Sequence, residues 1–141
     1  MAVTGARSGF GALLKRGDGG GTEVFSTVAE VVNIGDVSST LGTADATHME
    51  SPDRFMEKIP TLFEQQPVSV ELNYLPGDTS QNLLRADHLA ATLRNFQITI
   101  PGSVKVVSFS AYVTKAGPAF PHDNKMTQTI ELTPSGKANI A

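Results

Sequence analysis

The alternation of apolar and polar residues predicts a chain built mainly from β-strands. From Val68 to Tyr74 apolar residues recur at every second position, and Ser69, Glu71 and Asn73 stand between them. This period of two is typical of a strand with one buried face. The same alternation appears at 96–100 and 126–132, and β-branched residues predict a further strand over 22–34 that ends at Gly35.

Turn residues divide these strands. Pro101 and Gly102 follow Ile100 and predict a hairpin whose second strand runs from Val104 to Thr114. The apolar phase slips at Val106, which predicts a β-bulge there. Residues 116–124, AGPAFPHDN, are rich in turn formers and predict a loop before the last strand.

One helix is expected, over about 79–92. Asp78 is a suitable N-cap, and Gln81 follows three residues later as in a capping box. Apolar residues at helical spacing predict the stripe that faces the core: Leu83, Ala86, Ala90 and Leu93. The expected fold is therefore mainly β (α+β), a single domain over 1–141 that forms an antiparallel β-sandwich or barrel with one flanking α-helix.

Residues 35–67 predict a long loop between strands, with a short turn near Gly42. Structureless connections longer than about 12 to 15 residues are uncommon in compact domains unless they are functional or disordered. Several large apolar residues argue against disorder, namely Phe55, Met56, Ile59, Leu62 and Phe63. We expect another molecule to cover them, and the alternative is an Ω-loop packed on its own domain.

The two ends of the chain are expected to lie outside the sandwich. Four glycines among residues 17–21 predict a flexible N-terminal arm over 1–21, which orders on contact through Phe10, Leu13 and Leu14. Residues 133–141 are expected to form a short C-terminal tail.

Composition narrows the classes of function. The net charge of -3 disfavours a surface that grips nucleic acid through phosphate contacts. The absence of Cys excludes disulfides, thiolate catalysis and Cys-ligated zinc. No segment has the length and apolarity of a signal peptide or a membrane span, so no membrane association is expected.

Catalytic motifs are absent from the sequence. His48, His88 and His122 are far apart and lack the spacing of metal ligands. There is no G-x-S-x-G elbow, and the glycines at 17–21 lack the pattern of a phosphate-binding loop. We expect no catalytic residue, no cofactor, no metal and no enzymatic activity.

The order of these parts resembles the tail tube proteins, also called major tail proteins, of long-tailed bacteriophages. The resemblance covers nearly the whole chain and is carried by short pieces in order: Ala29-Glu30-Val31, Thr47-His48 with Ser51-Pro52-Asp53, Ile59-Pro60, Val68-Ser69-Val70-Glu71-Leu72 and Arg94-Asn95-Phe96. The chain has Thr61-Leu62 where the family often has Gly-Leu. It stops at Ala141, so we expect the tube-forming part without the immunoglobulin-like domain of some members.

The resemblance implies a structural virion protein, assembled in the bacterial host cytoplasm, whose hexameric rings stack into a hollow tube for genome delivery. Its partners would be copies of itself, a tape-measure protein and tail-end proteins, with DNA only in transit. The candidate inter-subunit contacts are Phe10, Leu13, Leu14, His48, Asp53, Phe55, Met56, Ile59, Leu62 and Phe63. The candidate lumen-lining residues, which include no Lys or Arg, are Ser69, Glu71, Asn73, Gln97, Thr99, Thr127, Thr129 and Glu131.

Three alternatives stay open. A tail terminator would form one ring and stop, and a type VI secretion tube protein would leave the cell. A small carbohydrate-binding β-sandwich is the third, although such sites generally present exposed aromatics and this chain has 6% aromatic residues and no Trp.

Overall fold

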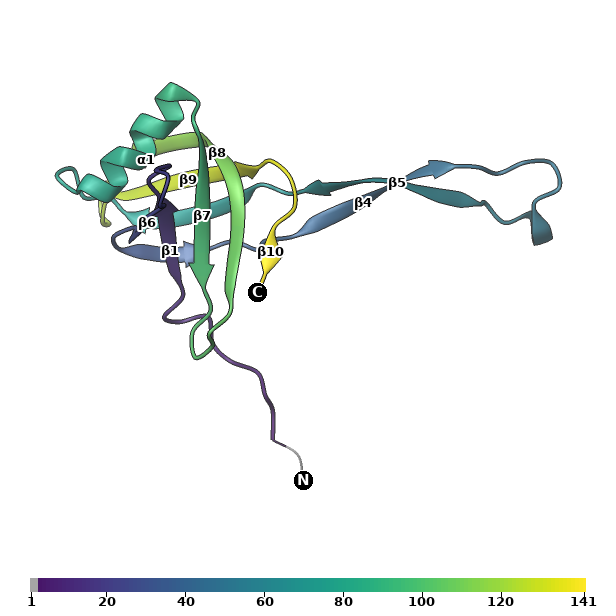
Figure 1. Ribbon diagram of the computed structural model, residues 1–141, viewed down its shortest axis with the longest axis horizontal. Helices are drawn as coiled ribbons and strands as arrows, with labels where there is room; N and C mark the ends of the chain where they lie inside the picture. The colour runs from purple at the N-terminus through teal and green to yellow at the C-terminus, as the bar shows by residue number, and fades with distance from the viewer. Residues whose placement is uncertain (1–2) are drawn as a thin grey trace.

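The body of the protein is one antiparallel β-sheet that curls around a single apolar core. The structure is a computed structural model and describes residues 3–141. The strand order in the sheet is β2-β1-β7-β8-β9-β6-β3, and β10 pairs with β8 beside β9 (Figure 1). The strands of this sheet are β1 (Leu13–Gly17), β2 (Phe25–Thr27), β3 (Val31–Ile34), β6 (Val68–Asn73), β7 (Leu93–Thr99), β8 (Val106–Ala119), β9 (Thr127–Pro134) and β10 (Asn139–Ile140).

The core lies on the inner face of this sheet and under the helix α1 (Thr79–Ala90). Alternate residues of β6, β7, β8 and β9 supply it, as the period of two predicts. Fourteen buried apolar residues form the cluster: Leu14, Val28, Val68, Val70, Leu72, Leu84, Phe96, Ile98, Val107, Phe109, Ala111, Val113, Ile130 and Leu132. The predicted fold class, an antiparallel β-sandwich or barrel with one helix, is confirmed.

The strand predicted over 22–34 is two strands with different partners. β2 pairs with β1, and β3 pairs with β6 on the opposite edge of the sheet. Between them the chain turns at Glu30, whose φ is 51°. The imperfect alternation of this segment reflects that turn, because no single register serves both strands.

The predicted bulge near Val106 is wrong in position. β7 and β8 pair in one unbroken register from Thr99↔Val106 to Leu93↔Tyr112. The register shift lies between Val113 and Lys115, against β9. β8 also continues to Ala119 through part of the predicted loop, since its second half has β9 as a partner.

Helix α1 begins where the sequence predicts. The Asp78 carboxylate accepts a hydrogen bond from the Gln81 backbone N–H at 3.0 Å, as a capping residue should. Hydrogen bonds from the Ser80 hydroxyl and this N–H hold the pKa of Asp78 below its usual value. The helix ends two residues earlier than predicted, because Ala91 is left-handed with φ 53°.

The side of α1 that faces the core was predicted wrongly. Leu83, Ala86, Ala90 and Leu93 all face outward, whereas the buried helix residues are Gln81, Leu84 and Asp87. Polar contacts explain this. The Gln81 amide oxygen accepts from the Leu75 N–H at 2.9 Å, and its amide nitrogen donates to the Asn73 carbonyl at 2.8 Å and the Ala29 carbonyl at 3.2 Å.

A buried ion pair fixes the other end of that face. Arg16 on β1 donates to both carboxylate oxygens of Asp87, at 2.5 and 3.0 Å, and Arg94 donates to one of them at 3.1 Å. Arg16 is 7% exposed and Asp87 is 3% exposed. Burying these groups unpaired would be costly, so their pairing determines how the helix is rotated on the sheet.

The predicted terminal segments are shorter than expected. Within the predicted N-terminal segment 1–21, residues 13–17 form β1 inside the sheet, and only residues 3–12 of the described chain precede this strand. The first two residues of the predicted N-terminal segment lie outside the described residues. Thr133 and Pro134 of the predicted tail belong to β9, and β10 pairs with β8.

Candidate assembly surfaces

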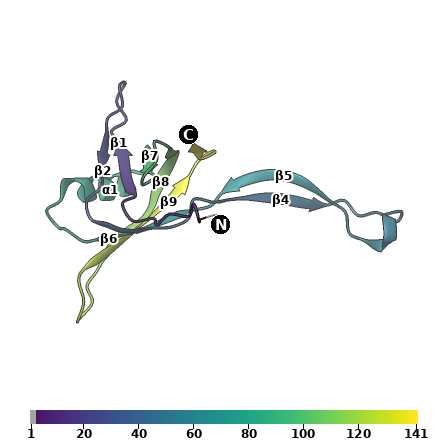
Figure 2. The same cartoon turned by 90° about the horizontal axis from the view of Figure 1, so that it is seen from below.

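Residues 39–65 form a long β-hairpin that projects from the body, here called the arm. Its strands are β4 (Ser39–Asp45) and β5 (Lys58–Gln65), joined by a tip that contains the short 3-10 helix η1 (Pro52–Arg54). Figures 1 and 2 both show the arm extending away from the sheet, with no other element beside its tip. The prediction of a structureless loop is therefore wrong, and so is the alternative of an Ω-loop packed on its own domain.

Backbone pairing along the arm is almost continuous. β4 and β5 pair antiparallel from Ser39↔Gln65 to Asp45↔Lys58, with one register shift next to Gly42. Gly42 is therefore within a strand and not at the expected turn. A Cβ at this position would lie 2.6 Å from the Thr61 hydroxyl oxygen, so the bulge favours glycine.

The tip is held by its own hydrogen bonds. The Asp45 carboxylate accepts from the Thr47 hydroxyl at 2.5 Å and from the Thr47 N–H at 2.8 Å, and these bonds hold the pKa of Asp45 below its usual value. Glu57 accepts from the Ser51 hydroxyl at 2.5 Å, and its carboxylate lies 3.2 Å from the His48 Nε2. The tip is thus a defined turn rather than a loose loop.

No residue of the arm is buried. Leu62 is 82% exposed, Phe63 76% and Phe55 74%, and the other large apolar side chains of the arm are also open to solvent, namely Leu41, Met49, Met56 and Ile59. An isolated two-stranded hairpin is only marginally stable in water. The arm therefore presents a surface that gains stability when another surface covers it.

The arm brings most of the predicted contact residues together. His48, Asp53, Phe55 and Met56 lie in its tip, and Ile59, Leu62 and Phe63 lie along β5. Asp53 occupies the left-handed region with φ 55°, as does Arg54 with φ 65°. Leu41 on β4 pairs with Phe63 and was missed, because the sequence did not show that these strands are paired.

The three N-terminal contact candidates differ in how far they are exposed to solvent. Leu14 is completely buried in the core, so its prediction as an inter-subunit contact is wrong. Phe10 is 92% exposed and Leu13 is 43% exposed. The inward side chain of Leu14 follows from its place in β1, opposite Ile98 of β7.

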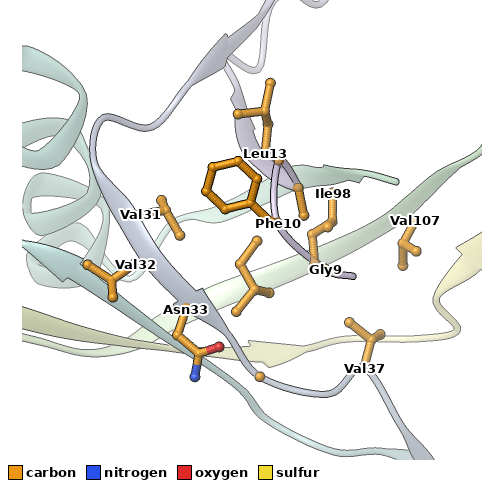
Figure 3. Close-up of a pocket in the computed structure, with 13 residues that line it drawn as sticks. Gly9, Phe10, Leu13, Val31, Val32, Asn33, Val37, Ile98 and Val107 are labelled. Atoms are coloured by element: carbon orange, nitrogen blue, oxygen red, sulfur yellow. The ribbon is translucent and has the colours of Figure 1, made fainter. Parts of the chain in front are cut away.

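Phe10 and Leu13 form one wall of an apolar groove of about 760 Å³. Figure 3 shows Phe10 on the same side of β3 as Val31, whereas Val32 lies on the other side of that strand, and Ile98 of β7 and Val107 of β8 also line the groove. The groove lies where the β1 end of the sheet approaches β3, since the curled sheet does not close there by backbone pairing. The groove residues of β3 were not predicted as functional, because Val31 and Val32 read as ordinary strand residues.

Six of the eight predicted lumen residues lie together on the outer face of β6 and β9. The register places Ser69 opposite Glu131, Glu71 opposite Thr129, and Asn73 opposite Thr127. Opposite residues in an antiparallel pair share a face, so the six form one patch, here called the polar face.

Gln97 and Thr99 do not join the polar face, since they lie on β7, with β8 and β9 between β7 and β6. Basic residues are also closer than the predicted set suggests. Lys115 is paired with Glu131 across β8 and β9, and Lys15 is paired with Gln97 across β1 and β7. The polar face is therefore uncharged or acidic except at its β8 border.

Other chemistry is sparse in the part of the chain that the structure describes. Residues 3–141 contain no group of three or more His, Cys, Asp or Glu placed to hold a metal ion. None of the described helices is long and apolar enough to cross a membrane. The features that remain are surfaces: an apolar arm, an apolar groove and a polar face.

The model of the family described as "Lambda phage tail tube protein, TTP" matches residues 19–141. The chain belongs to this family and is a structural component of a virion tail. No curated protein matches it.

Solved structures with the same fold come from phage tails and related injection machines. One is a protein in the tail of an empty gene transfer agent particle refined with C6 symmetry, to which the chain is 21% identical with a TM-score of 0.77. The match covers 96% of this chain and 99% of that one. A sheath/tube terminator structure of an extracellular contractile injection system gives 14% identity, a TM-score of 0.74 and 99% coverage of both chains. The SPP1 tail tube gives 12% identity, a TM-score of 0.66, and 92% and 74% coverage.

Proposed function

We propose that copies of this chain form hexameric rings that stack into the hollow tube of a phage tail, through which the genome passes. The observation that carries the proposal is the arm, which exposes its large apolar side chains and has no cover from its own body. The C6 symmetry of the gene transfer agent tail, whose protein shares this fold, supports rings of six.

The shape of the subunit favours a directional assembly. A projecting arm cannot pair with an identical arm around a ring, so it must contact a different patch on the neighbouring copy. Such head-to-tail contacts generate closed rings when the rotation closes and open filaments when it does not. A stack of rings contains both kinds of contact. The contacts within a ring close on themselves, and the contacts between rings repeat along the tube axis.

We propose that the polar face lines the lumen. Hydroxyl and amide groups together with Glu71 and Glu131 offer no cationic site for phosphates, so duplex DNA can move past them. Lys115 lies at the border of this face, opposite Glu131 in the register of β8 and β9. On this account Gln97 and Thr99 lie away from the lumen, since their face belongs to β7.

The lumen assignment is tested by reversing charge. Glu71→Lys and Glu131→Lys together should leave the tube intact, because both residues lie outside the core, and should slow genome delivery most at low salt. A matched control is Glu71→Gln with Glu131→Gln, which removes charge without adding cations. Normal delivery by tubes of the lysine variant at low salt contradicts the assignment.

The remaining partners follow from the tube. We expect a tape-measure protein within the lumen during assembly and tail-end proteins at the two ends of the stack, and we expect no catalytic activity from the tube itself. Assembly takes place in the cytoplasm of the bacterial host.

Electron microscopy of the purified, concentrated protein tests the proposed function. Tubes of uniform bore are the expected result. A tail terminator is the second candidate, because a sheath/tube terminator structure shares this fold, and it predicts single rings that do not stack. Monomers at every concentration would contradict both.

A further inference from the structure

We propose that the tip of the arm inserts into the apolar groove of a second copy of this chain. The inserting part, here called the knob, consists of Met49, Phe55 and Met56. The receiving groove is formed by Phe10, Leu13, Val31, Ile34, Val37 and Ile98. The inference rests on the proposed function, because it assigns the two halves of one contact between subunits.

The knob cannot reach its own groove. The arm extends away from the body in both views, and its tip lies at the far end from the sheet (Figures 1 and 2). Met49 is 102% exposed, Phe55 74% and Met56 66%. The exposed side chains of the knob therefore need a surface on another molecule.

The groove matches the knob in chemistry. Asn33 is the only polar side chain among its lining residues, and none of them is charged. The two other hollows described for this chain differ. One, near β10, is lined by Lys137, Asn139 and several serines, and the other, at the base of the arm, is lined by Glu64 and Lys137. Of these three hollows among residues 3–141, the first can receive apolar side chains without desolvating a charge.

The size of the groove also suits the knob. About 760 Å³ is within the range of about 300 to 1,000 Å³ seen for pockets that enclose small molecules, so it has room for several side chains. Phe10 in its wall is itself 92% exposed in the single chain, and the knob would cover it.

The knob is preorganised for this contact. Hydrogen bonds among Asp45, Thr47, Ser51 and Glu57 fix the backbone of the tip without using the knob side chains. A rigid turn loses little conformational freedom on binding, and methionine adapts to irregular cavities.

Cysteine cross-linking tests the pairing directly, because the natural chain has no Cys. The test variant carries Met56→Cys and Phe10→Cys, and the control carries Met56→Cys and Val104→Cys, where Val104 is 99% exposed in the β7–β8 turn outside the groove. Under mild oxidation of assembled tubes, the test variant should give covalent multimers on a denaturing gel, and the control should remain monomeric.

The outcomes separate this inference from the proposed function. Tubes of the test variant without cross-links, or equal cross-linking of the control, overturn the pairing and leave the tube proposal standing. Failure of the wild-type chain to form tubes or rings overturns both.

If the cysteine variant does not assemble, substitutions that introduce one charge on each side of the contact provide a second test. Met56→Lys alone and Phe10→Glu alone should each raise the concentration needed for tubes at least tenfold, and the double variant should recover most of that loss, since each contact then joins a cation to an anion. Equal impairment in the double variant overturns the pairing.

Discussion

Removing the two most exposed apolar side chains of β5 should disrupt assembly without unfolding the subunit. Leu62 is 82% exposed and Phe63 is 76% exposed in the single chain. Complete burial of such a side chain is worth about 1.5 to 3 kcal/mol. Scaled by these exposed fractions, the pair contributes about 2.4 to 4.7 kcal/mol to each arm contact before ordering costs.

The expected result for Leu62→Ser with Phe63→Ser is a higher critical concentration for tubes. Because about 1.4 kcal/mol corresponds to a factor of ten, the increase should be roughly 50-fold to 2,000-fold. Sedimentation of tubes over a dilution series measures this concentration. The monomer should keep its unfolding midpoint, since exposed substitutions usually change stability by less than about 0.5 kcal/mol.

The matched control keeps apolar area at the same positions. Leu62→Met with Phe63→Leu should assemble within a few-fold of the wild-type concentration. The reasoning is refuted if the serine variant assembles as readily as this control. It is also refuted if the monomer of the serine variant loses several kcal/mol of stability, which would show that the arm packs on its own body.

Three further outcomes follow from particular contacts. Asp87→Ala should lower the free energy of unfolding by about 3 to 5 kcal/mol in urea titrations, because Arg16 stays buried without its partner; a loss below about 1 kcal/mol contradicts this. Gln81→Ala should cost at least about 2 kcal/mol, since three backbone groups lose a hydrogen-bond partner, and an unchanged urea midpoint would argue against it. The hydrogen bonds from Thr47 depress the pKa of Asp45 in the folded protein below its usual value of 3.8. They therefore stabilise the tip fully at a pH above 3.8, and this stabilisation is lost as the pH falls through the lower folded pKa. Amide exchange at the tip should therefore rise on acidification in the wild type relative to Asp45→Asn, and identical profiles would contradict that.

Much of the fold could be predicted because the relevant signals are local. The alternation in β6 and the cap at Asp78 depend only on neighbouring residues, and both are confirmed. The exposure of Phe55, Leu62 and Phe63 was also predictable, since a small core has no room for so many extra apolar groups.

Long-range partners explain what could not be predicted. The rotation of α1 depends on Arg16, which lies 71 residues from Asp87 in the chain, so the apolar stripe alone indicated the wrong face. The pairing of β4 with β5 depends on a register that Gly42 shifts, and the apolar groove depends on β1 approaching β3. None of these contacts leaves a periodic pattern in the sequence.

Hydrogen exchange of residues 39–65, measured in assembled tubes and in subunits separated by dilution, tests the central claim most directly. The account predicts fast exchange along the arm in the separated subunit, slower exchange in the tube, and little change in the core strands β6 and β9. Equal exchange along the arm in both states would mean that no second copy covers it, and this result would contradict the account.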